Sequence, residues 1–271
     1  GGKVLKDITL GQYFPGNSAV HALDPRTKIA GALGCILIIF LLESAASYGV
    51  FLVFLAVLIL SAQLPFGLVL RSLKPLWPIL LLTVLIHAFS GQGETLAAWG
   101  PFAVTDGGLQ QGGRMAGRLA LLIVSSSLLT FTTSPIALTD GLEALLRPAK
   151  RWGLPAHELA MMMTIALRFI PTLLEETQRI IKAQEARGVD FSSGSLLRRG
   201  KNLVPVLVPL FISAFRRADE LATAMEARCY RGGEGRTRMH PLQYRRQDAV
   251  AALFLLLFAL LLVWLRWGMQ P

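Results

Sequence analysis

The sequence predicts an all-α integral membrane protein, with about five transmembrane helices and a cytoplasmic helical domain between the fourth and the fifth. Apolar residues make up 53% of the 271 residues, more than a soluble domain of this size usually carries. They gather in five blocks, and most of the basic residues lie outside these blocks. The blocks are 29–42, 48–62, 75–89, 115–133 and 249–265.

Each apolar block is interpreted as a transmembrane helix, because five such blocks cannot all form the core of one small soluble domain. Several are shorter than the ~20 residues that cross a bilayer perpendicular to its plane, although Ala, Gly and Ser flanks extend most of them. This interpretation divides the chain into four parts. They are a cytoplasmic N-terminal segment at 1–28, helices one to four at 29–133, the cytoplasmic helical domain at 134–247, and the last helix with the C-terminus at 248–271.

The distribution of Lys and Arg gives the orientation. Residues 134–247 hold 18 of the 27 basic residues against 11 acidic ones, whereas the connections 43–47 and 90–108 hold no Lys or Arg. Cytoplasmic loops carry the excess of Lys and Arg, so the N-terminus, the 63–74 loop and the 134–247 segment are expected in the cytoplasm. The other basic residues that support this orientation are Lys3, Lys6, Arg26, Lys28, Arg71 and Lys74.

Arg114 and Arg118 fit this orientation least well, because they lie near the outer end of the fourth block. They are four residues apart and therefore share one helical face. Two interpretations stay open: the side chains snorkel to the membrane interface, or they line a protein–protein surface within the membrane.

The pattern of residues 134–247 predicts helices. Ser134-Pro135 is a plausible helix start, and a short helix is expected over 136–147. A longer amphipathic pattern runs from 155 to Gly188, and Pro171 should bend or break it. A second pattern follows a linker at 192–202, with prolines near its beginning that favour a start or a kink there. These prolines are Pro205 and Pro209.

The sequence lacks the common signatures of catalysis. No G-x-x-x-x-G-K-[ST] motif is present, so no P-loop binds ATP. His21, His87, His157 and His240 are far apart and show no zinc-protease spacing. The two cysteines, Cys35 and Cys229, give neither a disulfide framework nor a metal spacing. We therefore expect no cofactor, no metal site and no enzymatic activity.

A repeated tripeptide is the strongest functional feature. Glu185-Ala186-Arg187 and Glu226-Ala227-Arg228 each end an amphipathic helical pattern in the basic segment. A cation at a helix C-terminus is favoured by the macrodipole, and a following glycine such as Gly188 gives a clean exit. Each arginine is therefore either a solvated C-terminal residue or a tip that enters an acidic groove of a partner, where its planar fork pairs with carboxylates.

The chain resembles, along nearly its whole length, the transmembrane T component of energy-coupling factor (ECF) vitamin transporters, an ABC-type importer class. The N-terminal stretches 11–18 and 21–28 look like its signature. Thr133-Ser134-Pro135, Arg147-Pro148 and Gly153-Leu154-Pro155 resemble its first coupling helix and the following turn. The residues that match most specifically are Pro15, Gly16, Asn17, Asp24, Pro25, Arg26, Lys28, Arg168 and Pro171, with the two signatures Ala186-Arg187-Gly188 and Ala227-Arg228-Cys229.

The resemblance implies a scaffold in a prokaryotic cell membrane. It would join two cytoplasmic ABC ATPase subunits to a small membrane protein, the capture (S) subunit, that binds the vitamin. Residues 185–188 and 226–229 would dock in the ATPases, and relative movement of the two helices would reach the capture subunit. Cys229 departs from the family pattern, which has glycine there. The N-terminal stretch resembles the version that several capture subunits share, and the transported vitamin or metal ion would be chosen by another polypeptide.

Two other functions remain as alternatives. A conventional ABC importer permease would bind substrate itself and would work in pairs with one coupling helix per subunit, whereas this chain carries two Glu-Ala-Arg helix ends. A membrane-anchored binder of nucleic acid would use the basic 134–247 segment. Its mixed charge and few interleaved aromatics argue against a single-strand binder, and no nucleic acid is expected as partner.

Overall fold

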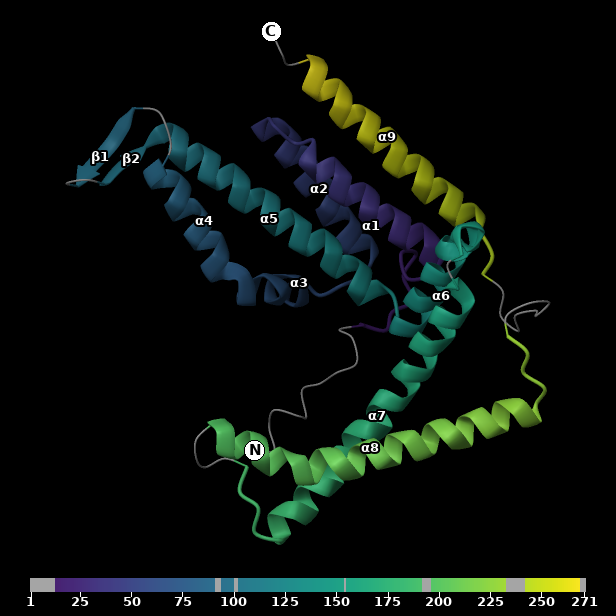
Figure 1. The fold of residues 1–271 in the computed structure, drawn as a ribbon. Coiled ribbons are helices and arrows are strands. Elements are labelled where there is room, and N and C mark those ends of the chain that lie inside the picture. The colour runs from purple at the N-terminus through teal and green to yellow at the C-terminus, as the bar shows by residue number, and fades with distance from the viewer. Residues whose placement is uncertain are drawn as a thin grey trace. The chain divides into compact units, whose positions relative to one another are not determined.

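The computed structural model describes residues 13–90, 94–99, 102–153, 155–191, 196–232 and 242–268 (Figure 1). Lys3, Lys6, Gly11, Gln12 and Leu154, which entered the sequence predictions, lie outside these ranges. The described residues fall into two compact units. The first unit comprises 13–141 together with 242–268, and the second comprises 142–232.

The first unit contains the apolar part of the chain. All five apolar blocks form helices, which confirms the predominantly helical class. The elements are α1 (Pro25–Phe40), α2 (Ala45–Ser61), α3 (Phe66–Leu73), the 3₁₀ turn η1 (Lys74–Leu76), α4 (Trp77–Ser90), β1 (Thr95–Trp99), β2 (Phe102–Thr105), α5 (Asp106–Thr132), the start of α6 (Pro135–Leu146) and α9 (Arg246–Gly268).

Side-chain caps define where several of these helices begin. Asp24 accepts a hydrogen bond from the backbone N–H of Arg26, and Pro25 occupies the first position of α1. Ser44 caps α2 and Thr105 caps α5 in the same way. Each cap satisfies an N–H that has no partner within its own helix, which stabilises a helix by about 1 kcal/mol.

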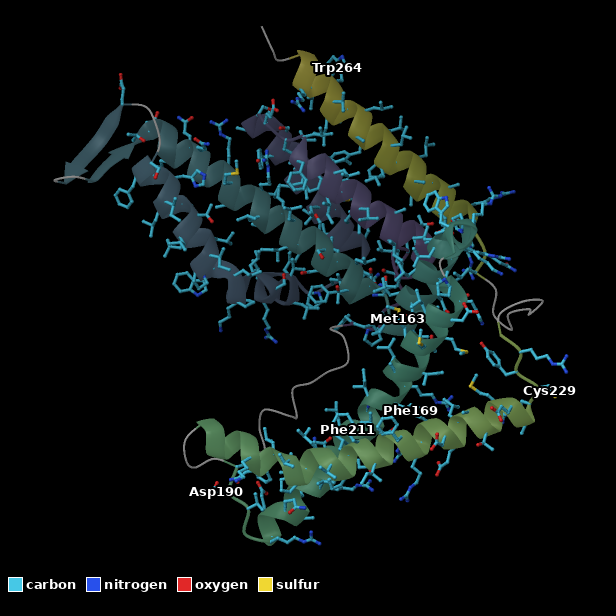
Figure 2. All side chains as sticks on the ribbon, viewed as in Figure 1. Met163, Phe169, Asp190, Phe211, Cys229 and Trp264 are labelled. Atoms are coloured by element: carbon cyan, nitrogen blue, oxygen red, sulfur yellow. The ribbon has the colours of Figure 1, made fainter. Side chains whose placement is uncertain are left out.

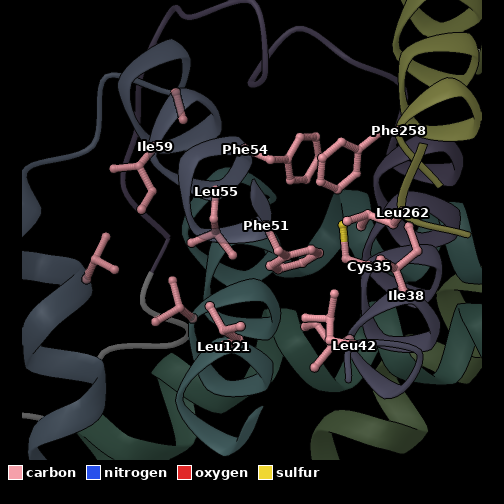
Figure 3. Packing of buried hydrophobic residues seen from close by; sticks show 14 of the residues in the cluster. Cys35, Ile38, Leu42, Phe51, Phe54, Leu55, Ile59, Leu121, Phe258 and Leu262 are labelled. Atoms are coloured by element: carbon pink, nitrogen blue, oxygen red, sulfur yellow. The ribbon is translucent and has the colours of Figure 1, made fainter. Parts of the chain in front are cut away.

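An apolar cluster lies where α1, α2, α5 and α9 pack together. The rings of Phe54 and Phe258 are stacked, with centroids 4.1 Å apart and planes 14° apart, and Figure 3 shows them face to face. Phe51 is fully buried beside them, as are Ile39 and Leu42 of the α1 end. Residues from the first and the last helix therefore share one core, so the two ends of the unit's sequence are packed together.

A short antiparallel hairpin in the 90–108 connection is the main departure from an all-α fold. Strand β1 pairs with β2, Trp99 lies opposite Phe102, and the register is irregular between Thr95 and Ala97. The two residues between the strands are Gly-Pro in the sequence, a dipeptide that favours turns. Apolar residues on both sides of that dipeptide were the signal that could have predicted the hairpin.

The second unit consists of the end of α6, the 3₁₀ segment η2 (Arg147–Trp152), α7 (Ala156–Ala186) and α8 (Leu196–Ala227). The predicted start of α6 is confirmed, since Ser134 Oγ accepts from the backbone N–H of Ala137. Of the bend or break expected at Pro171, the break is wrong, because α7 continues through it, and the bend stays a prediction. A proline removes only one backbone donor, and 31 residues of helix tolerate that loss.

Helix α8 begins earlier than expected. Pro205 and Pro209 favoured a start or a kink near residue 203, after a linker at 192–202. Instead the helix begins at Leu196 and runs through both prolines to Ala227. Its first turns are rich in Leu, Arg and Lys, which are good helix formers. The local propensity of 196–204 therefore prevails over the proline signal.

By length and composition, four helical segments among the described residues could cross a membrane. They are Phe66–Ser90, Asp106–Thr132, Ala156–Ala186 and Arg246–Arg266. Three of them contain apolar blocks that the sequence predicted as spans. The α1 helix, with 16 residues, and the apolar α2 helix, with 17, are shorter than these four. The α7 helix joins the set although the sequence predicted it as a coupling helix outside the membrane.

Candidate functional site

The first Glu-Ala-Arg tripeptide ends α7 in a Schellman turn. The Gly188 N–H donates to Glu185 O over 2.9 Å, and the Val189 N–H donates to Gln184 O over 3.0 Å. Gly188 has a φ of 86°, a conformation that glycine adopts without steric cost. The predicted helix end at Gly188 is confirmed, and Arg187 occupies the last position before the turn.

The second tripeptide ends α8 with the same hydrogen bonds. The Cys229 N–H donates to Glu226 O over 2.8 Å, and the Tyr230 N–H donates to Met225 O over 3.0 Å. Cys229 adopts a φ of 56°, so it takes the left-handed conformation that Gly188 takes at the first helix end. The two helices therefore end in the same backbone conformation, and the Cys229 side chain adds a steric cost of roughly 1 kcal/mol.

Both helix ends expose the same four positions. The residues at C3 and at C″ are half-buried in each turn, as is usual for the apolar contact of a Schellman motif, whereas the four residues between them are exposed. The exposed residues are Glu185, Ala186, Arg187 and Gly188 at the first end, and Glu226, Ala227, Arg228 and Cys229 at the second. Figure 2 shows Cys229 at the end of α8.

The two arginines present free guanidinium groups. Among the residues that the structure describes, neither Arg187 nor Arg228 has an ion pair or a side-chain hydrogen bond. In contrast, Arg217 of α8 pairs with Glu176 of α7 at 3.2 Å. The arginine between the two helices is thus engaged in packing, and the arginines at their ends remain available to a partner.

Three contacts fix how α7 lies on α8. Besides the Arg217–Glu176 pair, Gln184 Nε2 donates to Pro205 O at 3.5 Å. The contact made later in α7, at Gln184, meets α8 closer to its N-terminus than the contact made at Glu176. The two helices therefore run antiparallel where they cross. The Asn202 side chain also donates to Asp190 O at 2.7 Å, just beyond the α7 end.

The two helix ends are consequently far apart. Residue 205 lies next to the end of α7, and a helix rises about 1.5 Å per residue, so Arg228 is about 35 Å further along the α8 axis. A single small partner cannot cover both ends. The geometry suits two separate binding sites of the same kind.

Helix α8 carries a second apolar face that no described residue covers. The face toward α7 uses positions such as Val206, which is buried, and Arg217. The other face is exposed although its side chains are large, and one of them, Phe211, is 60% exposed. It consists of Leu203, Val204, Leu207, Val208, Phe211, Ile212 and Phe215.

The N-terminal signature residues take structural positions in the first unit. Pro15, Gly16 and Asn17 are exposed. A Cβ at Gly16 would lie 2.9 Å from the ring of His21, whose Nδ1 and Nε2 contact Ser18 Oγ and Phe14 O.

Asp24, Pro25, Arg26 and Lys28 lie together at the start of α1, next to residues that the sequence analysis did not select, Tyr244 and Asp248. Nothing in the sequence connects these two groups, since Asp24 and Asp248 are 224 residues apart.

Arg168 and Pro171 are both exposed on α7, one helical turn apart.

Arg118 contacts the chain just beyond the end of α1. Its Nη2 donates to Leu42 O at 2.8 Å, one residue past the Leu41 C-cap. The guanidinium is therefore held within the chain near a helix C-terminus, where the macrodipole favours a cation, and the two interpretations of Arg114 and Arg118 stay predictions. The Arg114 carbonyl accepts from Tyr48 at 3.3 Å, so the backbone of this turn also contacts α2.

Comparison with known proteins identifies the family. The profile of the CbiQ family, described as "Cobalt transport protein", matches residues 16–241. Proteins named "Energy-coupling factor transporter transmembrane protein EcfT" align over nearly the full length. The one from Acidaminococcus fermentans is 61% identical over 98% of this chain and 99% of its own. Those from Heliobacterium modesticaldum and Ruminiclostridium cellulolyticum are 56% and 53% identical, over 94% and 91% of this chain and 97% and 92% of theirs. The chain therefore belongs to the family of EcfT transmembrane components of energy-coupling factor transporters.

Proposed function

We propose that this chain couples two cytoplasmic ABC ATPases to a membrane-embedded capture subunit, using the two helix ends as docking tips. Family membership makes the chain a non-catalytic, multi-pass membrane subunit of a bacterial transporter. The observation that carries the proposal is the pair of matching Schellman ends. Each exposes a glutamate and an arginine that has no ion pair with another described residue, and the ends lie about 35 Å apart along α8.

Two tips with one geometry favour two copies of one kind of partner. A planar guanidinium at an exposed helix end can enter an acidic groove and pair with a carboxylate through two hydrogen bonds. Because ATP-driven closure changes the spacing of two docked ATPases, it would shift α7 against α8. The Arg217–Glu176 pair that joins the two helices is partly exposed, and such a pair typically contributes no more than about 1 kcal/mol, so it would not hold the crossing angle against this shift.

The exposed apolar face of α8, Leu203 to Phe215, is the surface that we assign to the capture subunit. By helical periodicity its centre, Val208, Phe211, Ile212 and Phe215, lies on the side of α8 away from Arg217, so a partner there can move with α8 without breaking that contact with α7. An exposed apolar face of this length on a charged helix is typical of a protein or membrane interface.

We place the 134–247 segment and the N-terminus in the cytoplasm. The excess of basic residues in 134–247 supports this orientation. Helix α7 is long and apolar enough to span a membrane, but its second half carries charges that pair with α8. Glu176 contacts Arg217, and Glu175 lies 4.0 Å from Arg179. A charged α7–α8 pair is costly inside a bilayer, so a location at the cytoplasmic surface is favoured.

The arginine tips can be tested by substitution. Arg187→Ala and Arg228→Ala should each weaken ATPase binding, and the double variant should lose ATPases on purification while still inserting in the membrane. A charge-paired interface arginine contributes roughly 2–5 kcal/mol. Arg179→Ala is the matched control, because Arg179 is an exposed arginine of α7 away from the tip. A double variant that retains ATPases and full uptake would contradict the docking role.

The stoichiometry of the purified complex and the identity of the transported vitamin provide two further tests of the proposed function. The purified complex should contain one copy of this chain per ATPase pair, and two copies would instead indicate a conventional permease. Uptake of a panel of radiolabelled water-soluble vitamins into proteoliposomes would identify the cargo, which we expect to be set by the co-purified capture subunit.

A further inference from the structure

The chain leaves the first unit after Gly141 and enters it again at residue 242. We call these two points the chain crossings, and residues at or near both of them contact the start of α1. On the outgoing side, Gly141 of α6 packs tightly on the first turns of α1. A Cβ at this position would lie 2.9 Å from Pro25 Cβ and 3.0 Å from Ile29 Cδ1. Real Cβ atoms do not approach that closely, so the contact requires glycine.

On the returning side, one buried carboxylate joins α1 to α9. The Asp24 N–H donates to Asp248 Oδ1 over 2.7 Å, and the Arg245 N–H donates to Asp248 Oδ2 over 2.8 Å. Asp248 is 3% exposed. A buried carboxylate that lost these donors would be unsatisfied, at a cost that makes the bridge hard to open.

Arg26 strengthens the same junction. Its backbone N–H, Nε and Nη2 donate to the Asp24 carboxylate at 2.9, 3.0 and 3.1 Å, and its guanidinium carbon lies 4.0 Å from the centroid of the Tyr244 ring. Burial alone would raise the pKa of Asp24, but the hydrogen bonds and the charge of Arg26 lower it overall. The carboxylate therefore remains ionised at neutral pH, and Arg26 stays in place over Tyr244.

A third contact reaches the end of α5. The Lys28 ammonium donates to His21 O and to Thr132 O, each at 2.9 Å. Thr132 is the last residue of α5, three positions before α6 begins. The start of α1 thus contacts the chain just before α6, within α6 and just before α9.

We propose that this cluster is a positioning clasp, which holds the two chain crossings at a fixed separation so that movement of the 142–241 segment reaches the membrane helices. The clasp consists of Asp24, Pro25, Arg26, Lys28, Ile29, Gly141, Tyr244 and Asp248. It rests on the proposed coupling function. The 142–241 segment can transmit movement to the membrane helices only if the two points where it joins them are fixed. Close-packed contacts of this kind do not deform continuously.

Spin labels test whether the clasp holds the crossings. Cysteines replace the exposed Ile136 of α6 and Gln247 of α9 in the full chain, with Cys35→Ala and Cys229→Gly removing the native thiols. The distance distribution between the labels should be narrow, and it should broaden in Asp248→Ala and in Tyr244→Leu. Tyr244→Phe keeps an aromatic face for Arg26 and should stay narrow. An equally narrow distribution in Tyr244→Leu would overturn the clasp.

Transport by the full complex tests what the clasp does. Tyr244→Leu should still bind ATPases and hydrolyse ATP, while the vitamin taken up per ATP falls at least about fivefold, the low end of ordinary coupling between sites. Tyr244→Phe should restore the ratio. An unchanged ratio in Tyr244→Leu, or loss of its ATPases, would overturn the positioning role. A wild-type complex without ATPases would refute the proposed function instead. The distances between the spin labels would still test whether the clasp holds the two crossings at a fixed separation.

Discussion

The two units differ in what lies between their helices. In the first unit, large side chains such as Phe51, Phe54 and Phe258 fill the space between α1, α2, α5 and α9. In the described part of the second unit, the buried apolar residues are Ala156, Ala160 and Val206, all of them small or of medium size. The first unit therefore has the packing of a body that holds itself together. Large apolar side chains are exposed in both units, but among the described residues only the first unit also buries large ones between its helices.

The largest effect should come from emptying the core of the first unit. Phe258→Ala removes a ring that stacks on Phe54 and contacts Phe51, and it should lower the free energy of unfolding by about 3 kcal/mol through lost packing and a cavity. Phe211→Ala, at a position that is 60% exposed on α8, should change the stability of the isolated chain little. Thermal unfolding in detergent compares the two, and similar losses would contradict the contrast between the units.

A smaller effect is expected from adding one methyl group to either unit. Gly141→Ala places a Cβ against Pro25 and should destabilise the first unit by about 1–2 kcal/mol through overpacking. Gly200→Ala in α8 meets nothing within 4 Å and should stabilise its helix by about 0.5–1 kcal/mol. Hydrogen exchange of α1 and α8 would resolve the two effects, which should have opposite signs.

The left-handed residues at the two helix ends of the second unit can be compared by a pair of opposite substitutions. Cys229→Gly removes a side chain from the left-handed conformation and should stabilise the end of α8 by about 1 kcal/mol. Gly188→Ala should destabilise the end of α7 by a similar amount, since its φ is 86°. Amide exchange of Val189 and Tyr230, whose N–H groups close the two turns, provides the measurement. Equal exchange in wild type and variants would show that the left-handed residues impose no strain.

The smallest effect should come from the ion pair between Glu43 and Arg266. Arg266 Nη2 lies 2.6 Å from Glu43 Oε1, but the side chains are 35% and 52% exposed. Exposed pairs typically contribute no more than about 1 kcal/mol, so Glu43→Gln should shift the thermal midpoint slightly and less at high salt. A shift as large as that of Phe258→Ala would mean that this pair is shielded from solvent in the membrane.

Local signals predicted the helices well and the prolines poorly. The apolar blocks, the start at Ser134-Pro135 and the end at Gly188 are all local features, and the structure confirms them. Pro171, Pro205 and Pro209 lie inside continuous helices, because the cost of one missing donor is spread over more than 30 residues of helix. The hairpin at 95–105 was missed, since two short strands in a long connection give a weak pattern.

The docking tips and the clasp differ in how far they could be foreseen. Each tip is a run of four residues whose Gly or Cys completes a local turn, so the repeat alone pointed to it. The clasp joins Asp24 to Asp248 and Arg26 to Tyr244. No periodicity or spacing relates residues more than 200 positions apart, so Tyr244 and Asp248 could not be selected from the sequence.

By itself, then, the sequence determined the helical class, the apolar segments and the two helix ends with their exposed arginines, because hydrophobic burial, capping and the helix macrodipole act over a few turns of chain. Only the tertiary structure decided that Arg118 contacts Leu42 just beyond α1, that α8 exposes an apolar face of its own, and that the start of α1 contacts both Gly141 and Asp248. These features depend on which distant residues meet when the helices pack, and that is a property of the whole fold.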